Sequence, residues 1–107
     1  MILFEGTAIA RAEPELDGLS AYAGAWSRYR GEAFGAYGTV DQGYILCTKD
    51  EESYYYICYR KGAAPRRSVS FFKKASALRA AYMDDPLWIH SHWGQGWVSR
   101  FKADAGL

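Results

Sequence analysis

The sequence predicts one small α+β domain, in which an antiparallel sheet made of an N-terminal strand and two hairpins carries two helices on one face. Its 107 residues are 50% hydrophobic and 23% charged, which is typical of a single globular domain that buries its own core. Two β-rich runs flank a short polar turn, which indicates a hairpin. Two other segments repeat apolar residues at steps of three and four, which indicates helices. Strands and helices in this order favour the α+β class.

The first strand and the first helix are predicted within residues 2–30. Residues 2–11 alternate loosely between apolar and polar side chains, as a strand with one buried face does. Pro14 suits the first turn of a helix, and the acidic residues around it suit the positive end of that helix. Gly31 is a natural stop for the helix. Its apolar stripe consists of Leu16, Leu19, Tyr22, Ala23, Trp26 and Tyr29.

Glycines interrupt residues 32–43, which are predicted to form a weak strand that ends in a turn at residues 41–43. A mobile loop is the alternative for this stretch. The glycines do not match a dinucleotide-binding fingerprint, because their spacing differs and because they follow a helix instead of a strand.

The clearest pattern in the chain is a hairpin at residues 44–60, with a polar turn at residues 50–53. An even-length loop would place Tyr56 opposite Cys47. Cys58 would then share a face with Cys47 on a diagonal, so a disulfide between them is not expected. Both cysteines lie inside apolar strands, which favours buried structural thiols over a reactive nucleophile.

A second helix and a second hairpin are predicted to complete the domain. Ser68 or Ser70 can cap a helix that runs to about Met83 and ends at Asp84-Asp85-Pro86. The second hairpin has strands at residues 87–93 and 97–101 around a glycine turn, and residues 102–107 are expected to fray. If residues 32–43 are a loop and the last strand is an extension, the order becomes βαββαβ. This ferredoxin-like arrangement is the alternative fold.

Composition predicts a cytoplasmic protein without a membrane segment, metal or cofactor. No apolar run approaches the roughly 20 residues that a membrane helix needs, and the first residues do not form a signal peptide. Two cysteines are fewer than a small secreted domain usually carries, which favours a reducing compartment. No cofactor motif stands out in the sequence.

The charges are divided unevenly along a chain of net charge +1. Residues 1–54 carry nine acidic and four basic side chains, a net of −5, and residues 55–107 carry three acidic and nine basic ones, a net of +6. Such a two-signed chain permits a charge-complementary partner or a head-to-tail contact between copies.

Aromatic residues give the leading functional hypothesis, a non-enzymatic binding protein that engages a protein partner or a second copy of itself. The chain has nine Tyr, four Trp and five Phe, more than one small core readily hides. Tyr and Trp are enriched at interfaces because they bury a large area at small entropic cost. If the helices cover one sheet face, the other presents either Tyr54, Tyr56 and Trp88 or Tyr55, Tyr59 and Trp97.

Two histidines support a second hypothesis, a small-molecule pocket or a modest enzyme. On a strand, His90 and His92 would point to the same face about 7 Å apart. Either one could transfer a proton together with Asp85 and a tyrosine hydroxyl. The pair could also supply two metal ligands, but no second fixed-spacing element completes such a site.

A run of basic residues supports a third hypothesis, weak nucleic-acid binding. Residues 60–74 hold no acid, and aromatic residues lie among the cations, a combination that suits phosphates and stacked bases. The nearly neutral chain argues against it. The cations are Arg60, Lys61, Arg66, Arg67, Lys73 and Lys74.

Overall fold

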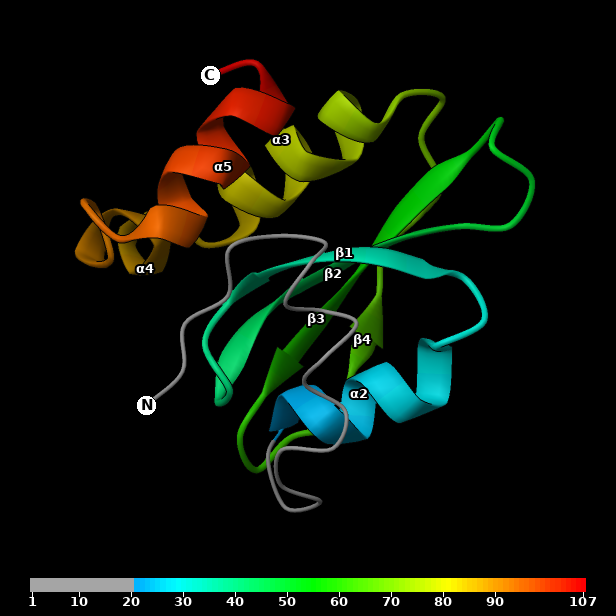
Figure 1. The fold of residues 1–107 in the computed structure, drawn as a ribbon, viewed down its shortest axis with the longest axis horizontal. Coiled ribbons are helices and arrows are strands. Elements are labelled where there is room, and N and C mark those ends of the chain that lie inside the picture. The colour runs from blue at the N-terminus through cyan, green and yellow to red at the C-terminus, as the bar shows by residue number, and fades with distance from the viewer. Residues whose placement is uncertain (1–20) are drawn as a thin grey trace.

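The computed structural model describes residues 21–107, which form a four-stranded antiparallel sheet with helices packed against it (Figure 1). The sheet is a meander in which neighbours in the chain are neighbours in space. The α+β class with an antiparallel sheet is therefore confirmed. The predicted N-terminal strand and the start of the first helix lie outside the described residues. The strands are β1 (Ala33–Gly38), β2 (Gln42–Thr48), β3 (Tyr54–Arg60) and β4 (Arg66–Arg67).

Helices cover both faces of this sheet, so the prediction that they share one face is wrong. In Figure 1, α2 (Ala21–Tyr29) lies below the sheet, whereas α3 (Lys74–Asp84) and α5 (Gly96–Ala105) lie above it. The ring of Tyr22 in α2 packs 5.7 Å from that of Tyr59. In β2 and in β3, every residue except the first and the last is buried, whichever face of the sheet its side chain points to. Both faces of these two strands must therefore be covered.

The two faces are told apart by strand pairing. Tyr37 is opposite Tyr44, and Tyr44 is opposite Cys58, so these three side chains share a face. Phe101 of α5 packs edge-on against Tyr37 at 5.5 Å, and we call this the α3 face. Tyr59 follows Cys58 and therefore points to the other side, which we call the α2 face.

The predicted second hairpin is wrong, because residues 86–105 form two helices. Pro86 begins α4 (Pro86–Ser91), a position where its fixed φ angle suits a helix. In α5, Trp97, Phe101 and Ala105 recur every four residues and are fully buried. Gly106 ends α5 in the left-handed conformation, with φ 72°. Residues 102–105, part of the tail that was expected to fray, belong to α5.

The hairpin of β2 and β3 is confirmed, but its predicted register is off by one residue. Tyr55, not Tyr56, lies opposite Cys47. The connection holds five residues and needs a left-handed Glu51, with φ 64°. Because a shift of one residue turns a side chain to the other face, Cys47 and Cys58 lie on opposite faces. Both thiols are free and buried.

The remaining elements differ from the prediction mainly at their boundaries. The glycine-rich stretch is a strand, β1, with an irregularity between Ala33 and Gly35. The second helix begins later than predicted, because the Ser68 hydroxyl accepts the Tyr56 N–H at 2.9 Å instead of capping a helix. Within residues 21–107 no strand follows α3, so the ferredoxin-like alternative is not the observed order.

Candidate binding site

The tyrosines and tryptophans of the predicted recognition face lie mostly in the core. The side chains of Tyr55, Tyr56, Tyr59 and Trp97 are buried, and those of Tyr54 and Trp88 are half-buried. The buried tyrosines satisfy their hydroxyls internally: Tyr55 donates to Glu32, Tyr56 to Asp84 and Tyr59 to the Thr39 carbonyl. Two covered sheet faces thus absorb the aromatic surplus that the sequence predicted for a surface.

The two histidines make different contacts, because His90 lies in the last turn of α4 and His92 is the residue that ends this helix. His90 stacks on Trp93 at 4.6 Å, and its Nε2 lies 2.7 Å from the Tyr82 hydroxyl. His92 packs against Trp88 at 4.7 Å. No group of three metal-ligating side chains gathers within residues 21–107.

Within residues 21–107 no hydrogen bond joins Asp85 to either histidine. Asp85 accepts a hydrogen bond from the guanidinium of Arg60 at 2.8 Å and another from the amide of Gln42 at 3.2 Å. The predicted acid–base group of His90, His92 and Asp85 is therefore not assembled in this structure. Cys47 offers no nucleophile either, because burial raises the pKa of its thiol to about 12.

The basic residues of the predicted nucleic-acid segment are spread over several surfaces. Arg60 pairs with Asp85, and Lys61 lies in the exposed turn after β3. Arg66 and Arg67 are neighbours on a strand and point to opposite faces, where the Arg67 guanidinium lies 3.8 Å from the centre of the Tyr55 ring. The last two cations of the segment, Lys73 and Lys74, lie together beside a groove.

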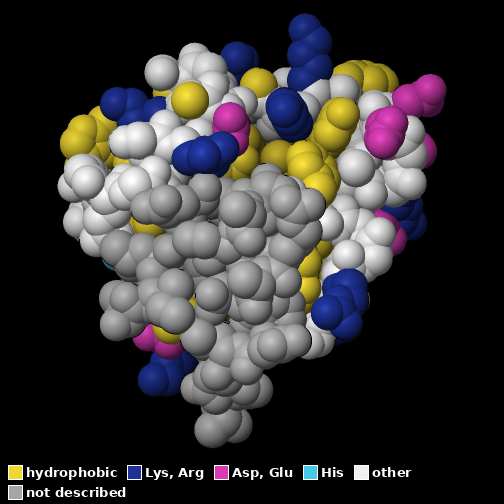
Figure 2. All heavy atoms as spheres, in the orientation of Figure 1, with side chains coloured by type: hydrophobic (Ala, Val, Ile, Leu, Met, Phe, Trp, Pro, Cys, Tyr) yellow, Lys and Arg dark blue, Asp and Glu magenta, His cyan; other side chains and the backbone are white. Residues whose placement is uncertain are grey.

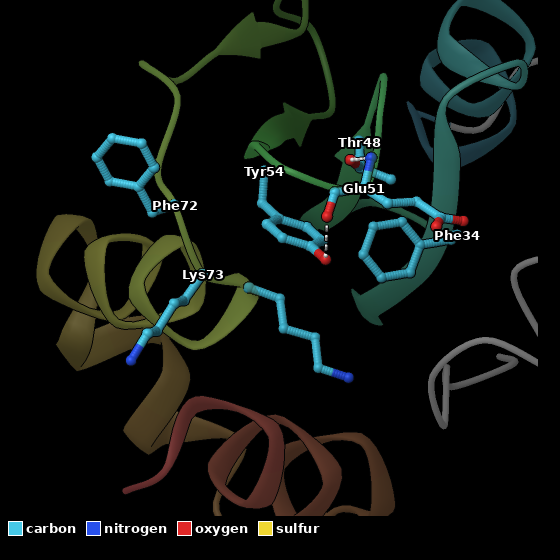
Figure 3. A pocket seen from close by; sticks show the side chains of 7 residues that line it. Phe34, Thr48, Glu51, Tyr54, Phe72 and Lys73 are labelled. Atoms are coloured by element: carbon cyan, nitrogen blue, oxygen red, sulfur yellow. Dashed lines mark hydrogen bonds between the residues drawn. The ribbon is translucent and has the colours of Figure 1, made fainter.

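This groove has a volume of about 630 Å³, and we call it the corner groove. It occupies the end of the α3 face nearest the β2–β3 turn. The rings of Phe34 and Tyr54 meet edge to face there, with centroids 5.9 Å apart, and Figure 3 shows them side by side. Phe72 and Lys73 stand across from them at the start of α3. The lining residues are Phe34, Thr48, Glu51, Tyr54, Phe72, Lys73 and Lys74.

The groove stays open because the helical layer does not reach this corner. α3 begins only at Lys74, and α5 packs on β1 around Tyr37, further from the turn. Hydrogen bonds fix the opposite wall: the Tyr54 hydroxyl donates to the Glu51 carbonyl at 3.2 Å, and the Glu51 N–H donates to the Thr48 hydroxyl at 2.9 Å. A ligand would therefore meet a preformed aromatic wall.

Charge differs between the two sides of the groove. Lys73 and Lys74 stand on the α3 side, and the first turn of α3 contains no acidic residue and no side-chain cap, so its dipole adds positive potential. Glu51 belongs to the turn side. Figure 2 shows acidic side chains at the upper right, where the β2–β3 turn lies, and Lys and Arg side chains along the top. The α3 side thus favours anionic groups.

The lining of the groove includes Tyr54, Lys73 and Lys74, which the sequence put forward as binding residues, and also Phe34 and Phe72, which it did not. Phe72 stands directly before two lysines and is 91% exposed, but nothing local in the sequence shows that exposure. Phe34 reaches Tyr54 only because β1, β2 and β3 pair in order, which is a property of the whole sheet.

Comparisons with known protein families, with curated proteins and with solved structures find no match to this chain. Within residues 21–107 no helix has the length and apolar character to span a membrane.

Proposed function

We propose that this protein is a non-enzymatic binding protein that engages another protein through the corner groove. The observation that carries this function is the open corner itself, where Phe34 and Tyr54 form one wall and the exposed Phe72 stands beside Lys73 and Lys74. Free, buried cysteines suit a reducing compartment, so we also place the function in the cytoplasm.

The groove combines the two properties that protein-binding sites use. Covering a phenylalanine that is almost fully exposed contributes about 1.5–3 kcal/mol, and Phe34 and Tyr54 extend that apolar surface. Few side chains usually dominate such a contact, and aromatic residues are common among them. The lysines add preference for acidic partners and a faster encounter, with little affinity of their own.

Selection from a random peptide library displayed on phage tests this function. The purified full-length protein is the bait, and enriched clones are then measured on two double variants. Phe72→Ala with Lys73→Ala removes one exposed ring and one cation from the groove. Met83→Ala with Lys61→Ala removes one exposed apolar side chain and one cation elsewhere on the surface.

We expect enriched clones to bind the groove variant at least about tenfold more weakly and the control variant unchanged, because only the first variant loses hot-spot contacts. Circular dichroism checks that both variants fold. Equal binding to the two variants, or no enrichment over an unrelated bait, would contradict the proposed function. Light scattering of the purified protein at several concentrations measures its self-association and so shows whether a second copy competes for the groove.

A further inference from the structure

The chain that leads into the corner groove is itself an open sheet edge. From Arg66 to Phe71 it runs antiparallel to β3, beginning with the pair Cys58 and Arg66. It ends with Tyr54 and Phe71, which exchange two backbone hydrogen bonds of 2.7 Å. Between these two pairs β3 advances four residues and the edge advances five, so the edge is roughly 13 Å long and contains an irregularity. β4 is the last strand of the sheet, so within residues 21–107 no strand lies on its outer side. We call residues 66–71 the β4 edge.

Backbone amides on this edge are available to another strand, whereas the Val69 carbonyl already accepts a hydrogen bond from the Ser68 hydroxyl at 2.7 Å. Val69 is 74% exposed, and Arg66, Arg67 and Ser70 are also exposed. Neither the Val69 nor the Ser70 amide donates a hydrogen bond within the described part of the chain. An exposed edge of this kind is a template for the addition of a strand.

The charges on the edge are unbalanced. Between residues 66 and 74 there are four cations and no acid: Arg66, Arg67, Lys73 and Lys74. None of the four forms an ion pair within residues 21–107, where the single ion pair joins Arg60 and Asp85. Two copies of this chain that met edge to edge with antiparallel strands would place Arg66 and Arg67 of each copy opposite residues 70 and 71 of the other, towards its Lys73 and Lys74. Like charges on facing strands repel, so the edge opposes pairing with itself.

Apolar side chains complete the surface. Val69 lies on the edge, and Phe72 follows at the point where the edge meets the corner groove. A strand that pairs with the edge can therefore place apolar residues on Val69 and Phe72 and acidic residues near the arginines and lysines.

We propose that the partner is an extended acidic segment that adds to the sheet as a fifth strand along the β4 edge and ends in the corner groove. This inference rests on the proposed function and names the partner's chemistry. Main-chain hydrogen bonds hold the added strand, and its acidic side chains select it over neutral or basic strands. The arginines that oppose a second copy attract this segment.

Two synthetic heptapeptides test the charge preference: Glu and Lys versions of one alternating sequence, X-Val-X-Phe-X-Val-X, each capped at both ends. Backbone amide shifts of the ¹⁵N-labelled full-length protein are followed at low salt. We expect the Glu peptide to shift amides of residues 66–74 and to bind at least tenfold more tightly than the Lys peptide. Arg66→Glu with Arg67→Glu should abolish that preference, whereas Lys61→Glu, a control in the neighbouring turn, should keep it.

Two N-methylated forms of the Glu peptide test strand addition without any change to the protein. One form is methylated on the odd-numbered residues and the other on the even-numbered residues, and we call these the two phases. Because successive amides of a strand point to opposite edges, each form blocks the amides on one edge of the peptide. An added strand uses only one edge, so one phase should lose binding at least tenfold and the other should retain it. Contact through side chains alone would weaken both equally.

The proposal is overturned if the Lys peptide binds as well as the Glu peptide, if both methylated phases behave alike, or if the amides of residues 66–74 do not shift. It is also overturned if a ten-residue oligothymidylate binds this edge more tightly than the Glu peptide does. Library clones that still depend on Phe72 and Lys73 would then leave the proposed function standing. If the library clones do not depend on Phe72 and Lys73 either, both the proposed function and this inference are overturned.

Discussion

Buried tyrosine hydroxyls supply many of the polar contacts inside this fold, and the partner of each hydroxyl decides what its removal costs. Tyr37 donates to the Asp104 carboxylate at 2.7 Å and ties β1 to α5. The Tyr44 ring is also buried, packed against Tyr56, Trp88 and Phe101, but its hydroxyl has no partner within residues 21–107. A buried hydroxyl without a partner costs about 1–3 kcal/mol of desolvation.

Replacement of these two tyrosines by phenylalanine should therefore have opposite effects. Tyr37→Phe should lower the free energy of unfolding by about 1–2 kcal/mol, because it leaves Asp104 without its donor. Tyr44→Phe should leave the free energy unchanged or raise it by up to about 1 kcal/mol, because the ring packing stays and an unpaired hydroxyl disappears. Urea unfolding of the two variants measures both changes. Equal destabilisation by the two substitutions would show that the Tyr44 hydroxyl does have a partner.

Glycine plays different parts in the strand β2 and in the helix α2. At Gly43, a Cβ atom would lie 2.4 Å from the Tyr37 carbonyl oxygen and 2.6 Å from the Tyr59 hydroxyl, so the sheet closes only around a residue without a side chain. At Gly24, a Cβ atom would meet no atom of residues 21–107 within 4 Å. The first glycine is required by packing, and the second only weakens a helix.

A matched pair of alanine substitutions tests this difference. Gly43→Ala should destabilise the fold by about 1–3 kcal/mol, because the backbone of β1 or the Tyr59 ring must move. Gly24→Ala should stabilise it by about 0.5–1 kcal/mol through helix propensity. Thermal melting of the two variants gives the sign directly, and a stabilised Gly43→Ala protein would contradict the observed pairing of β1 with β2.

Elements with long, repeated patterns were predicted well, and short apolar runs were not. The β2–β3 hairpin was recognisable because five aromatic or β-branched residues follow a polar turn with a single interruption. In residues 87–101, Trp, Ile and Val have high β propensity, yet only tertiary packing shows that Trp97 and Phe101 face the same side of a helix. A short apolar run fits both the two-residue period of a strand and the 3.6-residue period of a helix. Burial against the sheet therefore decided that residues 87–101 are helical.

At the scale of the whole molecule, the buried phenols make stability depend on alkaline pH. Burial raises the pKa of five tyrosines, and in three of them a carboxylate that accepts the hydroxyl's hydrogen bond raises it further. A phenol whose pKa is higher in the folded state contributes stability below its unfolded pKa of about 10, and that stability is lost as the pH rises beyond it. The five are Tyr37, Tyr44, Tyr55, Tyr56 and Tyr59.

The melting temperature should therefore be nearly constant from pH 7 to 9 and should fall steeply above pH 10. Tyrosinate absorbance near 295 nm should appear together with unfolding, since these phenols ionise mainly in the unfolded chain. Tyr37→Phe has one such phenol fewer and should show a shallower fall. A melting temperature that stays level to pH 11, with early tyrosinate absorbance, would show that these rings are open to solvent.

The sequence by itself determined the class of this fold, the β2–β3 hairpin, the strand before it and the two free cysteines, because local periodicity and turn residues decide such features. Only the tertiary structure decided which faces are covered. A five-residue turn set the register of β2 and β3, and the helices α3 and α5 packed on one side while α2 packed on the other. Burial on both faces turned the predicted surface tyrosines into core and left Phe34, Tyr54 and Phe72 at a corner that the helices of residues 21–107 do not reach. Which residues meet at that corner depends on the pairing of strands that are distant in the sequence, and a local sequence pattern contains no information about that pairing.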